Sequence, residues 1–229
     1  MDHTALFEQL RRFDTPTIVN ALEIAGAGRA ITGFTRHTLI AAFPSLPSIV
    51  GYARTAAIRC STPFDPAVRR QMQTGYYDYV GQGGQPTIAI VQDVDSLPGV
   101  GAFWGEVNTH VHRGLGCLGA VTNGSMRDLD AMDPKFQCLA GSLCPSHAWV
   151  QVVEFGKPVD VFGMNVKDND IVHADRHGAV VIPAAFLAKI PAAIDLMARK
   201  EKVILDAAKK PGFTAALMRE ALAASDQVK

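Results

Sequence analysis

Residues 105–128 read GEVNTHVHRGLGCLGAVTNGSMRD, and this segment decides how the middle of the chain can fold. Its centre, GLGCLG at 114–119, matches the dinucleotide-binding pattern G-x-G-x-x-G. That pattern works only where the glycines follow a strand and open a helix. Here the glycines follow a predicted helix over 105–113, because three apolar residues share one helical face, namely Val107, Val111 and Leu115. The glycines therefore lie at a helix-to-strand turn, which excludes a dinucleotide site.

The two ends of this segment indicate a different kind of site. A helix that begins near Gly105 leaves its first backbone amides without partners inside the helix, those of Glu106, Val107 and Asn108. Such amides bind a carboxylate or phosphate, and the glycine lets the ligand approach the backbone. Residues 119–123 are predicted to form a strand, and the NGSMRD turn after it would bring Arg127 and Asp128 to the sheet edge. The two ends could thus line one pocket.

These residue types suit a reaction that passes through an enolate. An arginine fork can hold a carboxylate and also stabilise an enolate oxygen. Carboxylates can hold Mg²⁺ or Mn²⁺, and such an ion polarises the carbonyl of a 2-keto acid. Aldol cleavage and decarboxylation both need this electron sink. The alternative is that Arg127 and Asp128 form a surface ion pair worth ~0–1 kcal/mol, and the spacing of the residues leaves both interpretations open.

The rest of the chain predicts a β-rich middle between helical ends. Residues 14–28, DTPTIVNALEIAGAG, have an N-cap, a first-turn proline and terminal glycines, with an inner stripe of Ile18, Leu22 and Ile24. From residue 49 onward short β-rich runs alternate with Gly, Pro or Asp. Residues 184–229 have a helical composition with a Pro-Gly break at 211–212. We therefore predict a single α/β domain over residues 1–229, with a mixed sheet or two packed sheets.

The bulk composition excludes several classes of partner. Lys plus Arg number 22 and Asp plus Glu number 22, so no overall field favours nucleic acid or a membrane surface. The most apolar long window, 178–198, is broken by Pro and charged residues, and the N-terminus lacks the pattern of a signal peptide. The four cysteines include no C-x-x-C pair and are expected to be reduced core residues. We expect a cytoplasmic protein that binds neither nucleic acid nor membranes.

Four segments of the chain resemble one known family. They are TPTIVNALE, VGYARTA, the pair WGEV and GAVTNGSMRD, and NDIVHADRHGAVVIP, which together span roughly residues 14 to 200. In this combination the chain resembles the group that contains 4-hydroxy-4-methyl-2-oxoglutarate aldolases and regulator-of-ribonuclease-activity (RraA-like) proteins. The resemblance implies layered mixed β-sheets in a swivelling β/β/α-like sandwich with flanking helices. It also implies a homotrimer or homohexamer with sites between subunits, so residues 184–229 would pack on their own domain or on a neighbouring subunit.

The resemblance also implies roles for the residues at the two ends of the segment. Asp128 would ligate the divalent metal, and Arg127 would contact the carbonyl or enolate oxygen of the keto acid. Glu106 would hold a metal-bound water, while Gly105 and the amides of Val107 and Asn108 would receive the carboxylate. A further acid would come from a neighbouring subunit, for which Glu201 is the candidate. Two departures from the family pattern are Asn20, where many members have Asp, and residues 167–170, KDND in place of a Pro-Gly-Asp turn.

Histidines are concentrated in the middle of the chain, with five of the seven between 110 and 177. His110 lies four residues after Glu106 and is expected on the same helical face, whereas His112 is rotated off it. His173 and His177 flank a strand-to-strand turn, where a solvated or hydrogen-bonded role is expected. We therefore predict that His110 or His147 contacts the distal part of the substrate.

The leading hypothesis is a divalent-metal-dependent lyase that cleaves a C–C bond of a 2-keto acid and releases pyruvate, with Arg127 and Glu106 as its catalytic residues. The alternative is a non-enzymatic RraA-like regulatory protein that masks a partner, because members of both kinds share one fold. Hydrolysis or isomerisation at a histidine-assisted metal site is a third possibility.

Overall fold

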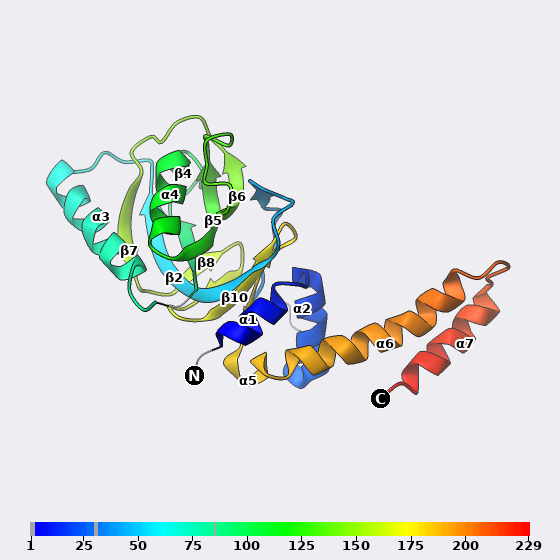
Figure 1. The fold of residues 1–229 in the computed structure, drawn as a ribbon. Helices are drawn as coiled ribbons and strands as arrows, with labels where there is room; N and C mark the ends of the chain where they lie inside the picture. Colours follow the sequence, from blue (N-terminus) through cyan, green and yellow to red (C-terminus); the bar gives the residue numbers. More distant parts are fainter. Residues whose placement is uncertain (1–2, 30–31, 85) are drawn as a thin grey trace.

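A mixed β-sheet carries the site and is covered by helices, as Figure 1 shows for the computed structural model of the chain. The structure describes residues 3–29, 32–84 and 86–229. Strand order in the sheet is β1-β6-β5-β3-β2-β10-β11, with β4 paired to β5 and β7 paired to β2. The predicted α/β class with a mixed sheet and flanking helices is confirmed.

Parallel strands form the centre of the sheet, and antiparallel strands flank them. The parallel strands are β2 (Ile49–Arg59), β3 (Thr87–Asp93), β4 (Ala102–Trp104), β5 (Cys117–Met126) and β6 (Gln137–Leu143). The antiparallel neighbours are β1 (Ile40–Ala41), β7 (Gln151–Phe155), β10 (Ile171–Asp175) and β11 (Gly178–Ile182). The central strands are apolar on both faces, since parallel strands are covered on both sides. In β3, Ile88 and Ile90 pack into one core while Ala89 and Val91 pack into the other.

A small hairpin closes one face of the sheet. It consists of β8 (Val159–Val161) and β9 (Met164–Val166), joined by Phe162 and Gly163, both with positive φ. This is the two-residue turn whose twist suits a hairpin. Val161 and Met164 are fully buried against β3, β5 and β6.

Two helices cover the opposite face, α3 (Pro66–Val80) and α4 (Glu106–Gly114). The sequence analysis predicted α4 and missed α3. The start of α3 does carry a signal, because the Asp65 side chain accepts hydrogen bonds from the amides of Ala67 and Val68 and Pro66 occupies the first turn. The buried face of α3 consists of Tyr76 and Val80, and the polar stretch RRQMQ before them carries no apolar helical periodicity in the sequence.

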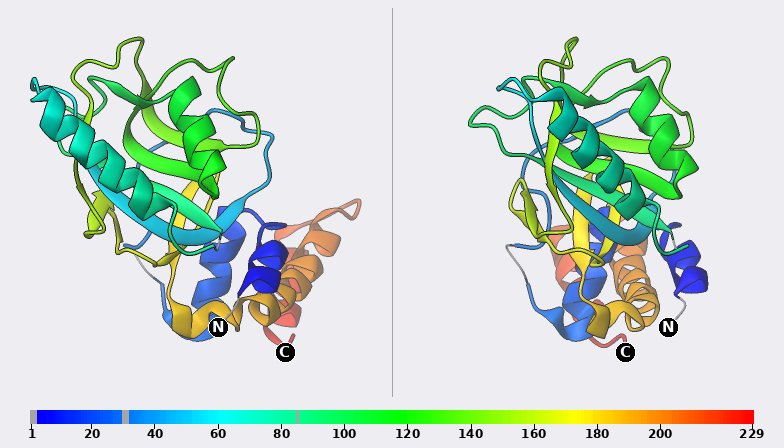
Figure 2. Two further views of the ribbon diagram at one scale, coloured as in Figure 1. Left: turned by 60° about the vertical axis from the view of Figure 1, so that its left-hand side comes forward. Right: turned by 90° about the vertical axis from the view of Figure 1, so that its left-hand side faces the viewer.

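The N-terminal helices lie at one end of the sheet, beside the first part of the C-terminal region, as Figures 1 and 2 show. They are α1 (Thr4–Leu10) and α2 (Thr15–Leu22), followed by a π-helical turn, η1 (Glu23–Ala27). Ile18 and Leu22 are buried as predicted, but Ile24 is exposed. The prediction for Ile24 is wrong because the α-helix ends before it and Gly26, with φ of 99°, kinks the chain.

The C-terminal region forms α5 (Ala184–Leu187), α6 (Ile190–Ala208) and α7 (Ala215–Asp226). The first half of α6 packs on the domain through Ile190, Ala193, Ile194 and Met197. Its second half projects away from the sheet and pairs with α7, where the Ser225 hydroxyl donates to the Lys200 carbonyl at 3.0 Å. The predicted break at 211–212 separates the two helices. No helix in the described ranges is long and apolar enough to cross a bilayer.

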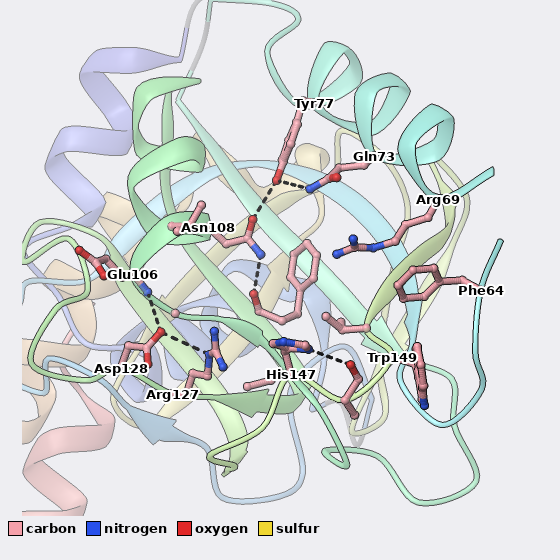
Figure 3. Close-up of a pocket in the computed structure, with 16 residues that line it drawn as sticks. Phe64, Arg69, Gln73, Tyr77, Glu106, Asn108, Arg127, Asp128, His147 and Trp149 are labelled. Carbon is pink, nitrogen blue, oxygen red and sulfur yellow. Dashed lines mark hydrogen bonds and ion pairs between the residues drawn. The ribbon is translucent and has the colours of Figure 1, made fainter. Parts of the chain in front are cut away.

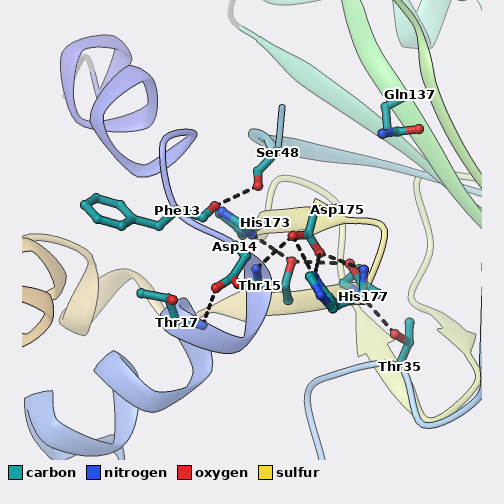
Figure 4. A network of polar contacts seen from close by, with 12 residues as sticks. Phe13, Asp14, Thr15, Thr17, Thr35, Ser48, Gln137, His173, Asp175 and His177 are labelled. Carbon is teal, nitrogen blue, oxygen red and sulfur yellow. Dashed lines mark hydrogen bonds and ion pairs between the residues drawn. The ribbon is translucent and has the colours of Figure 1, made fainter. Parts of the chain in front are cut away.

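A buried polar network ties α2 to β10 (Figure 4). The Thr15 amide donates to Asp175 Oδ2 at 3.2 Å, and the Thr15 hydroxyl lies 3.1 Å from His173 Nδ1. Burial lowers the pKa of His173 to about 4, so this histidine is neutral in the folded protein. His177 Nδ1 lies within hydrogen-bond distance of Asp175 Oδ2, at 3.1 Å. Both histidines thus have the hydrogen-bonded role predicted for them.

Acidification is expected to destabilise the protein through His173. In the unfolded chain its pKa returns to about 6.5, whereas the folded value is about 4. Between pH 4 and pH 6.5 the unfolded state binds one more proton, on His173, than the folded state does. The contribution of neutral His173 to stability is therefore complete above pH 6.5 and is lost as the pH drops toward 4. The slope is about 1.4 kcal/mol per pH unit for one such histidine.

Urea unfolding at pH 7.5 and pH 5 measures this effect in wild type, His173→Gln and the control His110→Gln, whose side chain is exposed. His173→Gln should shrink the loss of stability between the two pH values, and the control should not. Equal pH dependence in wild type and His173→Gln would contradict the assignment.

Candidate functional site

The parallel pairing of β4 with β5 brings the two ends of residues 105–128 together. Trp104 pairs with Met126, so Gly105 and Arg127 leave the sheet side by side. The amide of Arg127 donates to the Trp104 carbonyl at 2.9 Å. The sequence analysis placed residues 123–126 in a turn, but they are the end of β5, because Ser125 and Met126 also pair with Ser142 and Leu143 of β6. The expected meeting of the two ends is present, and β4, which was not predicted, produces it.

Close packing at the start of α4 requires glycine at position 105. A Cβ on Gly105 would lie 2.6 Å from Asp128 Oδ2, well inside contact distance. Gly105 is the N-cap of α4 and offers no side-chain acceptor. The Glu106 amide donates to Asp128 Oδ2 at 3.4 Å, while the amides of Val107 and Asn108 have no acceptor among the described residues. These two amides remain available to an anion.

Asp128 and Arg127 form an ion pair that faces solvent. Arg127 Nε lies 3.3 Å from Asp128 Oδ2, and about a third of each side chain is exposed, 35% and 37%. Asp128 has a φ of 54°, a left-handed conformation in which a non-glycine residue is strained. Among the described residues nothing donates a hydrogen bond to its second oxygen, Oδ1. The surface pair considered from the sequence is thus present, with one carboxylate oxygen free to bind a ligand.

These residues line one side of a cavity of about 460 Å³ (Figure 3). The predicted residues that line it are Gly105, Glu106, Val107, Asn108, Arg127, Asp128 and His147. His110 does not line it. Its Nδ1 lies 2.8 Å from the Glu106 carbonyl, and its ring is exposed on the side of α4. His110 lies on the same face of α4 as Glu106, as its spacing of four residues predicted. It does not reach the cavity because the cavity lies at the start of α4 and not along its side.

His147 reaches the cavity from the loop between β6 and β7. This loop is held against the segment that leads into β4, because the Ala102 amide donates to the Ser146 carbonyl at 2.8 Å. His147 Nδ1 lies 2.8 Å from the Ala148 carbonyl, which fixes the ring. Of the two histidines predicted to contact the substrate, only His147 therefore has the position to do so.

The opposite wall of the cavity comes from α3, from Phe64 two residues before it and from Trp149 of the β6–β7 loop. Its side chains are Phe64, Arg69, Gln73, Tyr77 and Trp149. Sequence reasoning missed all five because it missed α3 and did not separate the loop at Trp149 from the β-rich runs predicted after residue 49. Only residues 151–155 form β7.

A chain of hydrogen bonds joins this wall to α4. Gln73 Nε2 donates to the Tyr77 hydroxyl at 3.2 Å, and that hydroxyl donates to Asn108 Oδ1 at 2.9 Å. Asn108 Nδ2 donates to the Phe103 carbonyl at 2.6 Å. The Asn108 side chain is therefore occupied by protein partners, and only its backbone amide is open to a ligand.

His112 lies beneath the cavity and is part of the core. Burial lowers its pKa to about 4, so the ring is neutral. Nδ1 lies 2.7 Å from the Asn108 carbonyl and must carry the proton, so that Nε2 accepts from the Tyr76 hydroxyl at 2.8 Å. The expected apolar face of α4 is wrong: Val107 is 71% exposed, and the buried residues are Thr109 and His112. The helix turns this face inward because Tyr76 of α3 supplies the partner that His112 needs.

Two groups of residues offer ligands for a metal ion. Asp128 and Glu106 line the cavity, and Asp128 Oδ1 accepts no hydrogen bond from the described residues. Cys60, Asp93 and Asp95 form a second group whose ligand atoms lie within 4.8 Å of one another. There the carboxylates already accept backbone hydrogen bonds, from Asp95 and Gly99 to Asp93 and from Cys60 to Asp95. Burial also raises the pKa of the Cys60 thiol to about 12. This buried group orders the loop after β3, and the cavity pair is the better match for a hard cation.

Comparisons with known proteins agree with this geometry. The model of the RraA-like family, described as Aldolase/RraA, matches residues 15–181. This family contains aldolases or decarboxylases as well as non-enzymatic ribonuclease inhibitors. None of the curated proteins matches the chain.

Solved structures of similar fold cover most of the chain. An uncharacterized protein from Pseudomonas syringae pv. tomato is 21% identical, with a TM-score of 0.70 and coverage of 95% of this chain and 93% of its own. Streptomyces coelicolor RraAS2, described as an unusual member of the RNase ES inhibitor RraA family, is 20% identical, with a TM-score of 0.65 and coverage of 90% and 96%. A structure described under novel cellulases from gut-associated microbes is 15% identical, with a TM-score of 0.74 and coverage of 88% and 87%.

At these identities the structures establish the fold and not the reaction. The family model covers more than half of the chain, including both β-strands and the helix that build the cavity edge. The chain therefore belongs to the RraA-like family.

Proposed function

We propose that the protein is a divalent-metal-dependent lyase that cleaves a C–C bond of a 2-keto acid and releases pyruvate. The observation that carries this proposal is the convergence of three groups at one edge of the cavity. They are the Arg127 guanidinium, the Asp128 carboxylate and the free amides at the start of α4. Together they match the carboxylate, the keto oxygen and the cation that such a reaction has to hold.

Asp128 fits a hard divalent cation, and Glu106 lies at the same edge to hold a water of that ion. Asp128 Oδ1 is free of hydrogen bonds from the described residues, and Glu106 is exposed at the same edge. Oxygen donors of this kind are the ligands that Mg²⁺ and Mn²⁺ prefer. When bound, the ion would polarise the C2 carbonyl of the keto acid and stabilise negative charge on its oxygen.

The chain's own groups would then orient and protonate the substrate. The amides of Val107 and Asn108 receive the C1 carboxylate, since they point from the positive end of α4. Arg127 donates to the C2 oxygen and stabilises the charge that develops there. As the C3–C4 bond breaks, its electron pair becomes the C2–C3 double bond of the enolate. Glu106 takes up the proton of the C4 hydroxyl in aldol cleavage and returns a proton to C3, which gives pyruvate.

A neighbouring subunit is part of this proposal. Glu201 lies exposed on the part of α6 that leaves the domain, so it does not reach the cavity of its own chain. In a homotrimer or homohexamer the Glu201 carboxylate of one protomer would approach the cavity of the next. His147 would contact the substrate beyond C3, because it lines the same cavity.

Replacing Arg127 with Ala should reduce kcat/KM by about 100-fold or more, because one donor to a developing oxyanion is worth about 3–4 kcal/mol. Pyruvate release from oxaloacetate and from branched 4-hydroxy-2-oxo acids is measured through NADH oxidation by lactate dehydrogenase. Mg²⁺ or Mn²⁺ is present, and EDTA should abolish turnover.

Arg113→Ala is the matched control, since this arginine lies at the other end of α4 and does not line the cavity. Turnover that survives both EDTA and Arg127→Ala would contradict the proposed reaction. Absence of both turnover and Mn²⁺ binding would favour the alternative, a non-enzymatic regulatory protein.

Replacing Gly105 with Ala should weaken Mn²⁺ binding about tenfold or more, a loss of about 1.4 kcal/mol. The added methyl would lie 2.6 Å from Asp128 Oδ2 and would displace that carboxylate. Calorimetric titration with Mn²⁺ measures the change. Gly114→Ala is the control, because a methyl at this position of the same helix meets no atom within 4 Å. Equal Mn²⁺ affinity in wild type and Gly105→Ala would show that Asp128 does not hold the ion.

A further inference from the structure

The wall of the cavity on the side opposite Arg127 and Asp128 is aromatic. Three aromatic side chains line it: Phe64, Tyr77 and Trp149. In Figure 3, Phe64, Arg69 and Trp149 lie on one side of the cavity, with Glu106, Arg127 and Asp128 on the other. A keto acid held at Arg127 would thus extend its distal part toward this aromatic wall.

Arg69 is the cation of this wall, and its charge is not neutralised. The guanidinium carbon lies 4.6 Å from the centroid of the Phe64 ring, which stacks the planar group on the aromatic face. Among the described residues Arg69 forms no ion pair with an acid. Its N–H donors therefore remain available to an anionic group in the cavity.

The two outer rings of the wall are fixed against each other. Phe64 and Trp149 meet edge to face, with centroids 5.7 Å apart and an interplanar angle of 78°. This geometry is favoured for aromatic pairs. Trp149 is nevertheless 49% exposed, so its ring offers a large apolar surface to a ligand. Rings held in this way present an ordered surface on which a planar group can stack.

The cavity is larger than a small keto acid would fill. Its volume is about 460 Å³, within the ~300–1,000 Å³ range of pockets that hold drug-sized ligands. A small dicarboxylate such as oxaloacetate would occupy the Arg127 side and leave the aromatic wall in contact with water. A ligand with a planar aromatic group would cover both sides.

We propose that the distal subsite binds an aromatic ring with an anionic substituent, so that the substrate is a 4-aryl-4-hydroxy-2-oxo acid. This inference rests on the proposed lyase function. The ring packs against Phe64 and Trp149, stacking on one and meeting the other edge to face because the two rings are nearly perpendicular, and its anionic group accepts hydrogen bonds from Arg69. In the retro-aldol step the C3–C4 bond breaks and the C4 hydroxyl loses its proton. The products are an aryl aldehyde and pyruvate, whose C3 has gained one proton.

Unreactive analogues without the 4-hydroxyl test the subsite apart from the chemistry. Calorimetry with Mn²⁺ present compares 4-(4-carboxyphenyl)-2-oxobutanoate, 4-phenyl-2-oxobutanoate, 2-oxoglutarate and oxalate. The carboxyphenyl compound should bind about tenfold or more tightly than 2-oxoglutarate, because ring stacking and a charged hydrogen bond both add to its affinity. Affinity for 2-oxoglutarate equal to or above that of the carboxyphenyl compound would overturn the proposal.

Two substitutions test the aromatic part and the cationic part of the subsite separately. Phe64→Leu should lower the affinity for both aryl compounds about tenfold, and Arg69→Gln should remove the advantage of the carboxyphenyl over the phenyl compound. Neither should change oxalate binding, which reports on the Arg127 side. Arg70→Gln is the matched control, because this neighbouring arginine does not line the cavity. Unchanged aryl affinity in both Phe64→Leu and Arg69→Gln would overturn the proposal.

Three further results distinguish a failure of the aryl subsite proposal from a failure of the proposed lyase function. Preferred aryl binding without cleavage of the corresponding 4-hydroxy acid would refute the lyase and leave the subsite in place. Cleavage of small 4-hydroxy-2-oxo acids alone would refute the subsite and support the lyase. Dissociation of an oligomer in Phe64→Leu, measured by analytical ultracentrifugation, would show that the wall contacts another copy of the chain, and would also overturn the proposal.

Discussion

The pairing of β4 with β5 is the constraint on which the site depends. Only three residues of β4 lie in the sheet, but they place Gly105 next to Arg127 and Asp128. Because the Cα of Gly105 carries no side chain, the Asp128 carboxylate can approach the first amide of α4. Backbone pairing thus places the start of α4 beside the backbone of Arg127 and Asp128, and their side chains form the ion pair at that edge.

The second wall of the cavity is attached to this edge through α3. The hydrogen bonds from Gln73 through Tyr77 to Asn108 hold α3 on the cavity side, and the buried hydrogen bond between Tyr76 and His112 holds it on the core side. Neutral His112 suits this buried position, since a charged ring there would lack solvation. The fold therefore joins a polar edge suited to a keto acid and a cation with an aromatic wall suited to a larger distal group.

Much of the polar edge could be predicted from sequence, because local signals specify it. The spacing of residues 105–113, the glycine stop and the apolar run after it predicted α4 and β5, although the spacing gave the wrong buried face for α4. The positions of β4, His112 and α3 could not be predicted in the same way. β4 is a strand only through its pairing with β5, and buried His112 depends on the Tyr76 hydroxyl, which donates to its Nε2. The buried face of α3 consists of two residues within a polar helix, so its periodicity is too weak to reveal the aromatic wall.

Anomalous X-ray scattering from crystals grown with Mn²⁺ would locate the ion without any assumption about the reaction. We expect one strong peak beside Asp128 Oδ1 at the edge of the cavity, within about 2.0–2.6 Å of a carboxylate oxygen. A peak at Cys60, Asp93 and Asp95, or no peak at Asp128 when Mn²⁺ is present in excess, would contradict this expectation.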